Sequence, residues 1–334
     1  MPYPKPLSEK SLKKLYAQSG ISPEVRDYLH TMFAACANLY GAVTLREVWA
    51  VYQEIKYKPL RIHKRDVIAF SSIVRRESLP YRVYEIEELY VDEPHSEFDR
   101  FIVSNSLIGI GYGKLIWFYN LMEVRGSRSL YVPDDFLTFA ESTVTPEEQA
   151  LFDYIGDLRS TEKDCVPPYG DRYPNVNCGK KLSEFSFLNK EENFNVEWYE
   201  KNSSRHEALL RKYGGTEAEK IIRQYTLWEN IGDMDPTDVL SCVAEELTEA
   251  GVALTTVRFR RLTDLMMNAH NNSHLWCIGG WTPCELSART PRTGMPEISF
   301  GPGLQKALAD GSISKDDIFK TLSEMGFKVL PPKR

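Results

Sequence analysis

The chain lacks the features of a membrane or secreted protein. No apolar run in its 334 residues approaches the roughly 20 residues that span a bilayer. The first seven residues, Met1-Pro-Tyr-Pro-Lys-Pro-Leu7, contain no apolar core of a secretory signal. Six cysteines are spread along the whole chain, too sparsely for a disulfide framework. We therefore expect a cytoplasmic protein with no membrane partner.

Recognisable phosphate-binding motifs are also missing. The nearest approach is Gly109, Gly111 and Gly113, in Gly-x-Gly-x-Gly spacing. A Walker loop needs Gly-x4-Gly-Lys-Ser/Thr, and a dinucleotide site needs Gly-x-Gly-x-x-Gly after a strand. Neither pattern is met, so the glycines predict a turn, and no cofactor is expected.

The overall composition is that of an ordinary globular protein. Hydrophobic residues make up 42% and charged residues 26%, and the net charge is −6. A chain of this length is long enough for two or three domains. The negative charge argues against a protein that coats nucleic acid with its whole surface, but it is compatible with a local basic patch.

Three consecutive helices are predicted near the N-terminus, over residues 23–39, 44–55 and 63–76. Ser22 precedes the first helix as its N-cap, and Gly41 follows its end. Thr44 caps the second, with Glu47 three residues later as in a capping box. Leu79-Pro80 stops the third.

The third helix is amphipathic and basic. At about 100° per residue, Val67, Phe70, Ile73 and Val74 fall on one face. The other face carries Lys64, Arg65, Ser71, Ser72, Arg75 and Arg76. Residues 56–82 contain eight cations and two carboxylates, a local charge of +6. Cations on an exposed helix face suit phosphate contact, and the alternative is an ordinary solvated face. The candidate nucleic-acid-binding residues are Lys64, Arg65, Ser72, Arg75 and Arg76.

A β-hairpin is predicted over residues 81–91, which are rich in β-branched and aromatic residues. Three helices followed by a hairpin, within about sixty residues, form the outline of a winged helix-turn-helix. The hairpin is acidic, since it contains or adjoins Glu85, Glu87, Glu88, Asp92 and Glu93. A phosphate backbone would repel these carboxylates, which is the main argument against DNA binding.

The rest of the chain is predicted to be largely helical. Thr145-Pro-Glu-Glu148 has the cap, first-position proline and third-position glutamate of a helix start. Residues 160–181 lose periodicity and contain Cys165 and Cys178, without the close partners that a zinc site requires. Further helices are predicted over 196–213, 217–230, 236–250 and 254–268, and their apolar faces suit a helical bundle.

One polar cluster offers an alternative chemistry. His270 and His274 lie four residues apart, and Cys277 and Cys284 follow. Two such histidines on one helix face could ligate a metal, and a Cys–His pair could be nucleophilic. Asn271-Asn272 favours a helix end instead, followed by a tryptophan-rich turn. Neither a metal site nor a catalytic residue is therefore expected.

Several short motifs resemble a family of uncharacterised bacterial proteins. They are Ala37-Asn-Leu-Tyr-Gly41 followed by Leu45, Arg46 and Val48, then Glu88-Leu-Tyr90 as a strand, and Asn271-Asn-Ser273, Leu275-Trp276 and Gly280-Trp-Thr-Pro-Cys-Glu-Leu286. The resemblance covers about residues 22–286. Members often carry a C-terminal SecA-type zinc module, which is not intact in this chain. The resemblance implies no particular activity.

The sequence thus predicts a mainly α (α+β) protein. Its parts are a winged-helix domain (1–95), a mixed connecting segment (96–160), a linker (161–190), a helical bundle (191–290) and a small helical unit (291–334). The expected function is nucleic-acid binding or regulation through the winged helix, with double-stranded DNA as partner. The helical bundle would serve dimerisation or contact with another protein, and the oligomeric state is left open. The alternative function is a protein–protein adaptor without catalysis. A hydrolytic enzyme built on His270, His274 and Cys277 is the least favoured.

Overall fold

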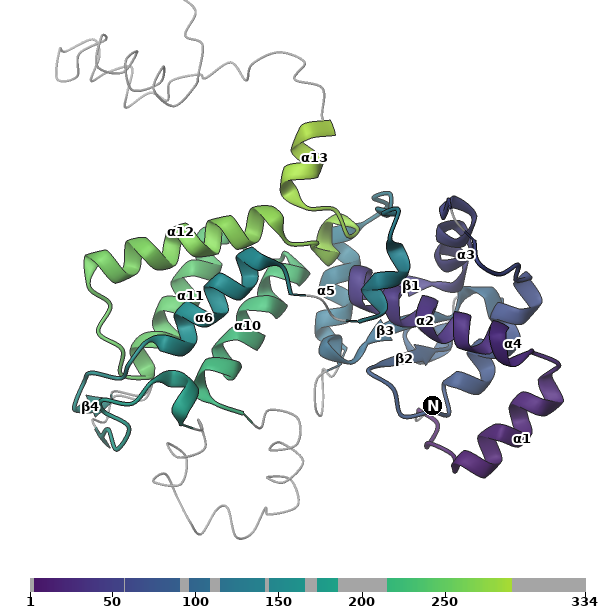
Figure 1. Ribbon diagram of the computed structural model, residues 1–334, viewed down its shortest axis with the longest axis horizontal. Coiled ribbons are helices and arrows are strands. Elements are labelled where there is room, and N and C mark those ends of the chain that lie inside the picture. The colour runs from purple at the N-terminus through teal and green to yellow at the C-terminus, as the bar shows by residue number, and fades with distance from the viewer. Residues whose placement is uncertain are drawn as a thin grey trace, which may run out of the picture. The chain divides into compact units, whose positions relative to one another are not determined.

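The computed structural model describes residues 3–56, 58–90, 96–108, 115–141, 144–165, 173–185 and 215–289. The chain divides into two compact units, Met1–Glu285 and Leu286–Arg334. In the described part, helices predominate, together with a three-stranded antiparallel sheet and a two-stranded ribbon (Figure 1). The prediction of a mainly helical protein is therefore confirmed.

The N-terminal elements of the first unit combine helices with the larger sheet. They are α1 (Glu9–Ser19), α2 (Pro23–Tyr40), β1 (Ala42–Thr44), α3 (Leu45–Glu54), α4 (Lys64–Val74), β2 (Tyr81–Tyr84) and β3 (Phe101–Ser104). β3 pairs with both other strands, which gives the strand order β1-β3-β2. Ile102 lies at the centre of the sheet, opposite Val43 on one side and Val83 on the other.

Local signals set the ends of these helices. The Ser22 side chain accepts a hydrogen bond from Val25 N, and Gly41 ends α2 with a positive φ of 71°. Thr44 and Glu47 form the predicted capping box of α3, because each side chain accepts a hydrogen bond from the other residue's backbone N. The three predicted helices are confirmed, and α4 spans Lys64–Val74 within the predicted 63–76.

The hairpin predicted within residues 81–91 is wrong. After β2, the chain turns into a 3-10 helix, η1 (Ile86–Glu88), in which the Glu88 carboxylate accepts from Glu85 N (2.8 Å). The strand that pairs with β2 is β3, which follows a second 3-10 helix, η2 (Glu97–Asp99). Glu88-Leu-Tyr90 is accordingly not a strand. The Glu88 carboxylate closes a turn, and Glu85 and Glu88 bind arginines, so the β-branched and aromatic residues around them do not continue as a strand.

The sheet separates two hydrophobic cores. Because successive strand residues point to opposite faces, Ile102 joins the core formed with α2 and α4, whereas Phe101 and Val103 face the other way. They pack with Phe118 and Leu121 of α5 (Ile116–Arg125). The helix α4 is thus held on a continuous apolar core that involves the sheet and the other N-terminal helices.

A separate core holds the helices of the second half. α6 (Pro146–Asp157), α10 (Glu217–Ile231), α11 (Pro236–Glu249) and α12 (Thr256–Asn272) share it (Figure 1). Their predicted caps, Thr145, Thr216 and Asp235 among them, are confirmed. The ribbon strands β4 (Asp164–Cys165) and β5 (Tyr173–Pro174) and the 3-10 helix η5 (Leu182–Glu184) lie between α6 and α10 in sequence. Three predicted features fall outside the described residues: the turn at Gly109, Gly111 and Gly113, the helix over 196–213, and the unit over 291–334.

A tryptophan-rich turn from the second half of the chain packs against the end of α2. It contains the 3-10 helix η6 (Trp276–Ile278) and leads to α13 (Pro283–Arg289). Trp276 Nε1 donates to Asn38 O (2.7 Å), and the indole ring lies directly beside Gly41. Two further 3-10 helices, η3 (Asn105–Leu107) and η4 (Phe136–Ala140), complete the described elements. Among these elements, no helix combines the length and apolar character needed to cross a membrane.

Candidate nucleic-acid interface

One face of α4 is fixed in the core. Val67, Phe70 and Val74 are buried, and Phe70 meets Phe33 edge-on, with ring centroids 5.0 Å apart. His63 precedes the helix as its N-cap, and its backbone N donates to the Asp66 carboxylate (2.8 Å). Because this face packs in the core, the opposite face of α4 points toward solvent.

The open face carries Arg65, Ala69, Ser72 and Arg76, which we call the α4 stripe. Arg65, Ala69 and Ser72 are spaced by four and three positions and therefore lie on one side of α4, and Arg76 follows in the turn after the helix ends at Val74. Arg65, Ser72 and Arg76 are exposed, and the Arg65 side chain retains 85% of its accessible surface. Its nearest charged partner is Asp66, at 3.7 Å, a surface pair that contributes little. The two arginines at the ends of the α4 stripe are therefore placed to meet an anionic partner.

Lys64 lies at the edge of the α4 stripe, beside two aromatic rings. Its Nζ is 5.4 Å from the ring centre of Phe98 and 5.8 Å from that of Trp49. Such cation–π contacts restrain the side chain while its charge stays exposed to solvent.

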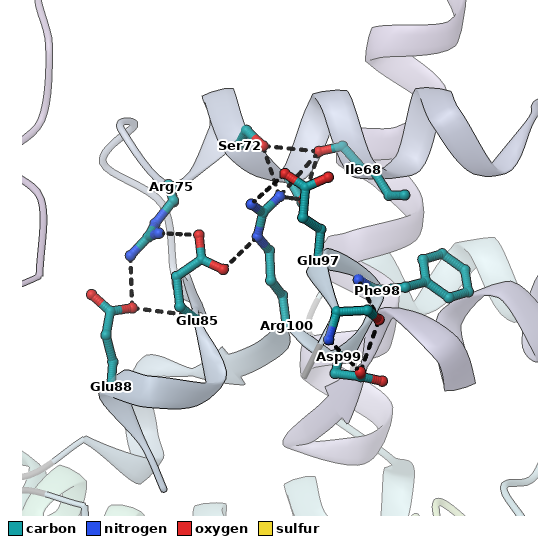
Figure 2. A network of polar contacts seen from close by, with 11 residues as sticks. Ile68, Ser72, Arg75, Glu85, Glu88, Glu97, Phe98, Asp99 and Arg100 are labelled. Carbon is teal, nitrogen blue, oxygen red and sulfur yellow. Dashed lines mark hydrogen bonds and ion pairs between the residues drawn. The ribbon is translucent and has the colours of Figure 1, made fainter. Parts of the chain in front are cut away.

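The expectation that Arg75 is an exposed cation is wrong. Its side chain is only 13% exposed, and its guanidinium binds Glu85 (2.5 Å) and Glu88 (2.6 Å) (Figure 2). The helical phase places Arg75 at the side of the α4 stripe, where the connection between β2 and β3 covers it. Arg75 therefore stabilises that connection and is not available to phosphates.

The neighbouring serines are also engaged inside the protein, by Arg100 at the start of β3. Arg100 Nη1 donates to Ser71 Oγ (2.9 Å) and Ser72 Oγ (2.7 Å), and its Nε donates to Glu85 (2.7 Å), as Figure 2 shows in part. Ser71, expected on the polar face, is buried because it faces this guanidinium. Ser72 remains exposed, but its hydroxyl already bonds to Arg100 and to Ile68 O. Nothing local in the sequence pointed to Arg100, which lies far along the chain from α4.

This network changes the electrostatics of the acidic connection. Glu85 lies between Arg75 and Arg100, and Glu88 binds Arg75. Two of the five carboxylates that opposed DNA binding are thus neutralised within the protein. Asp92 and Glu93 lie outside the described residues.

Replacing Glu85 with alanine is expected to destabilise the protein by about 2–3 kcal/mol. The substitution leaves the nearly buried Arg100 without its closest carboxylate, and the loss is below that of a fully buried pair because Glu85 is 27% exposed. Urea denaturation followed by circular dichroism measures the change. The matched control is Glu97→Ala, which removes a second carboxylate of Arg100 that is 3.4 Å away and 67% exposed. We expect a change within about 0.5 kcal/mol there; equal losses would contradict the role given to Glu85.

His270 and His274, which the sequence offered as an alternative metal-binding pair, contact different partners. His270 Nδ1 lies 2.5 Å from the Glu229 carboxylate, whereas His274 Nδ1 lies 2.8 Å from Gly280 O. Burial raises the pKa of the Cys277 thiol to about 11, which keeps it protonated at neutral pH, the opposite of an activated nucleophile. Cys284 is exposed on α13. Among the described residues, no three His, Cys, Asp or Glu side chains are grouped so as to hold a metal ion.

Two of the motifs behind the family resemblance, in residues 37–41 and in the segment 275–280, contact each other. Asn38 and Gly41 at the end of α2 contact Trp276, and Gly280 approaches the ring of Tyr40. These residues therefore join the two halves of the first unit. No family model, no curated protein and no solved structure matches this chain.

Proposed function

We propose that residues 23–104 form a winged helix-turn-helix. The order α2, β1, α3, α4, β2, β3 and the strand order β1-β3-β2 support this assignment, since a winged helix combines three helices with a small antiparallel sheet. In this assignment α4 is the recognition helix, and the connection between β2 and β3, with η1 and η2, is the wing.

The function we propose is binding of duplex DNA through the α4 stripe. The observation that carries the proposal is the open, basic face of α4, with Arg65 and Arg76 exposed at its two ends and Lys64 beside it. The major groove admits an α-helix, and exposed cations release counterions when they meet phosphates. The arginine pairing of Glu85 and Glu88 supports the same function, because it removes part of the repulsion between the wing and the DNA backbone.

Replacing Lys64, Arg65 and Arg76 together with alanine is expected to flatten the salt dependence of DNA binding. Each lost phosphate contact reduces the slope of log K against log salt by about 0.9, so the triple variant should lose roughly two to three units. Fluorescence anisotropy with a labelled duplex, between about 50 and 200 mM salt, measures the slope. Arg75 is left intact, because its ion pairs hold the wing and its removal would confound binding with stability.

The competing function is a protein adaptor that uses the same winged helix as a scaffold. It predicts a wild-type protein that does not bind duplex DNA even at about 50 mM salt, where non-specific electrostatic binding is strong. It also predicts that the triple variant loses a protein partner in a pull-down. The absence of binding by the wild type under those conditions would reject the DNA function.

A further inference from the structure

α1 is a second basic element beside α4. Lys10, Lys13 and Lys14 are exposed on it, and Lys13 pairs with Glu9 one turn away (2.6 Å). Lys10 and Lys14 are spaced four apart and point outward, and neither makes an ion pair with a described carboxylate. Like charges at this spacing repel and slightly weaken a helix. The charges of Lys10 and Lys14 therefore do not stabilise α1 through their interaction with each other.

α1 packs against the C-terminal half of α4 and the turn that follows it. The Tyr16 hydroxyl donates to the Glu77 carboxylate, and the Tyr16 ring lies 6.1 Å from the ring of Phe70. Just before α1, Leu7 N donates to Arg76 O (2.9 Å). Figure 1 shows α1 next to α4. These contacts tie the lysine-bearing helix to the end of the α4 stripe at which Arg76 lies.

The two sides of the α4 stripe differ in charge. Arg75, on one side, faces the wing, whose carboxylates at Glu85 and Glu88 are neutralised by arginines. Glu77, on the other side, faces Tyr16 of α1. A polyanion lying along the α4 stripe thus has α1, with its exposed lysines, on one flank and paired charges of the wing on the other.

We propose that α1 is a second phosphate-contacting element, so that a DNA duplex bound on the α4 stripe is held by Lys10 and Lys14 on one flank only. The inference rests on the proposed function, and it assigns the additional contacts to α1 rather than to the wing. Lysine side chains reach phosphates as flexible point charges, which suits contact with the backbone of either strand and carries no sequence information.

The test is the variant Lys10→Gln/Lys14→Gln in the full chain. Glutamine is a good helix former, and both side chains are exposed, so the melting temperature should not change. With labelled duplex DNA of mixed sequence, we expect the salt slope to become shallower by about one to two units and the affinity at about 50 mM salt to fall roughly tenfold. Lys10→Arg/Lys14→Arg keeps the charges and should bind like the wild type.

The control is Arg260→Gln/Arg261→Gln, which removes two exposed cations from α12 and changes the net charge by the same amount. It should leave both slope and affinity unchanged. If the lysine variant behaves like this control while the Lys64, Arg65 and Arg76 variant loses binding, the role of α1 is rejected and the proposed function stands. If the wild type does not bind duplex DNA at all, both are rejected.

Discussion

Replacing Phe70 with alanine is expected to lower the free energy of unfolding by about 3–5 kcal/mol. The side chain is fully buried, with its ring 4.8 Å from His30 and 5.0 Å from Phe33. Alanine would leave a cavity between α4 and α2, because a packed core collapses only in part around a missing ring. Urea denaturation followed by circular dichroism gives the change directly.

The matched control makes the same substitution at Phe259 on α12. This ring is 41% exposed, so its loss should cost about 1 kcal/mol or less. Similar losses at the two positions would mean that α4 turns a different face to the core, and the α4 stripe would then be wrongly placed as well. The stability measurement therefore also tests the orientation of the proposed recognition helix.

Gly41→Ala is expected to destabilise the protein by about 2–5 kcal/mol. Two effects add: a backbone with φ of 71° and ψ of −50°, which L-residues rarely adopt, costs at least about 1–2 kcal/mol, and crowding of the core costs roughly 1–3. A Cβ at this position would lie 2.5 Å from the indole ring of Trp276, and that ring is held by its hydrogen bond to Asn38. Thermal and urea denaturation measure the loss.

Gly20→Ala separates the two effects. Gly20 ends α1 with φ of 74°, and no atom lies within 4 Å of a Cβ added there. Only the backbone strain remains, so the loss should be about 1–2 kcal/mol. Equal losses of stability at Gly20 and Gly41 would show that Trp276 does not lie against the end of α2. The packing of the tryptophan-rich turn against α2 would then be rejected.

Helix positions were predictable because their signals are local. Ser22, Thr44, Thr145, Thr216 and Asp235 each cap a helix through bonds to residues two or three positions away. Such interactions depend only on neighbouring residues, so a short window of sequence contains them. α1 was missed although Ser8 caps it in the same way, because its apolar residues, such as Leu12, Leu15 and Tyr16, are few in a strongly polar segment.

Strand pairing was not predictable in the same way. β2 was placed correctly, but its partner was sought in the next few residues, where hairpin strands commonly lie. The carboxylates of Glu85 and Glu88 instead bind arginines, which ends the strand and delays the return of the chain to Phe101–Ser104. A pairing between distant segments depends on which contacts the whole chain can make, and a local pattern does not contain that information.

For the candidate site, too, the local sequence predicts some features and the tertiary structure decides the others. The amphipathic pattern of residues 64–76 by itself determined that Val67, Phe70 and Val74 are buried and that Arg65, Ser72 and Arg76 are exposed, because a helix of fixed period assigns residues to faces. Only the tertiary structure decided which cations remain free. Arg75 is paired with carboxylates of the connection between β2 and β3, Arg100 ties Ser71 and Ser72 to β3, and α1 packs against the end of α4 through Tyr16. Charge pairing acts across space between segments that are far apart in sequence, and the order of residues along the chain does not reveal it.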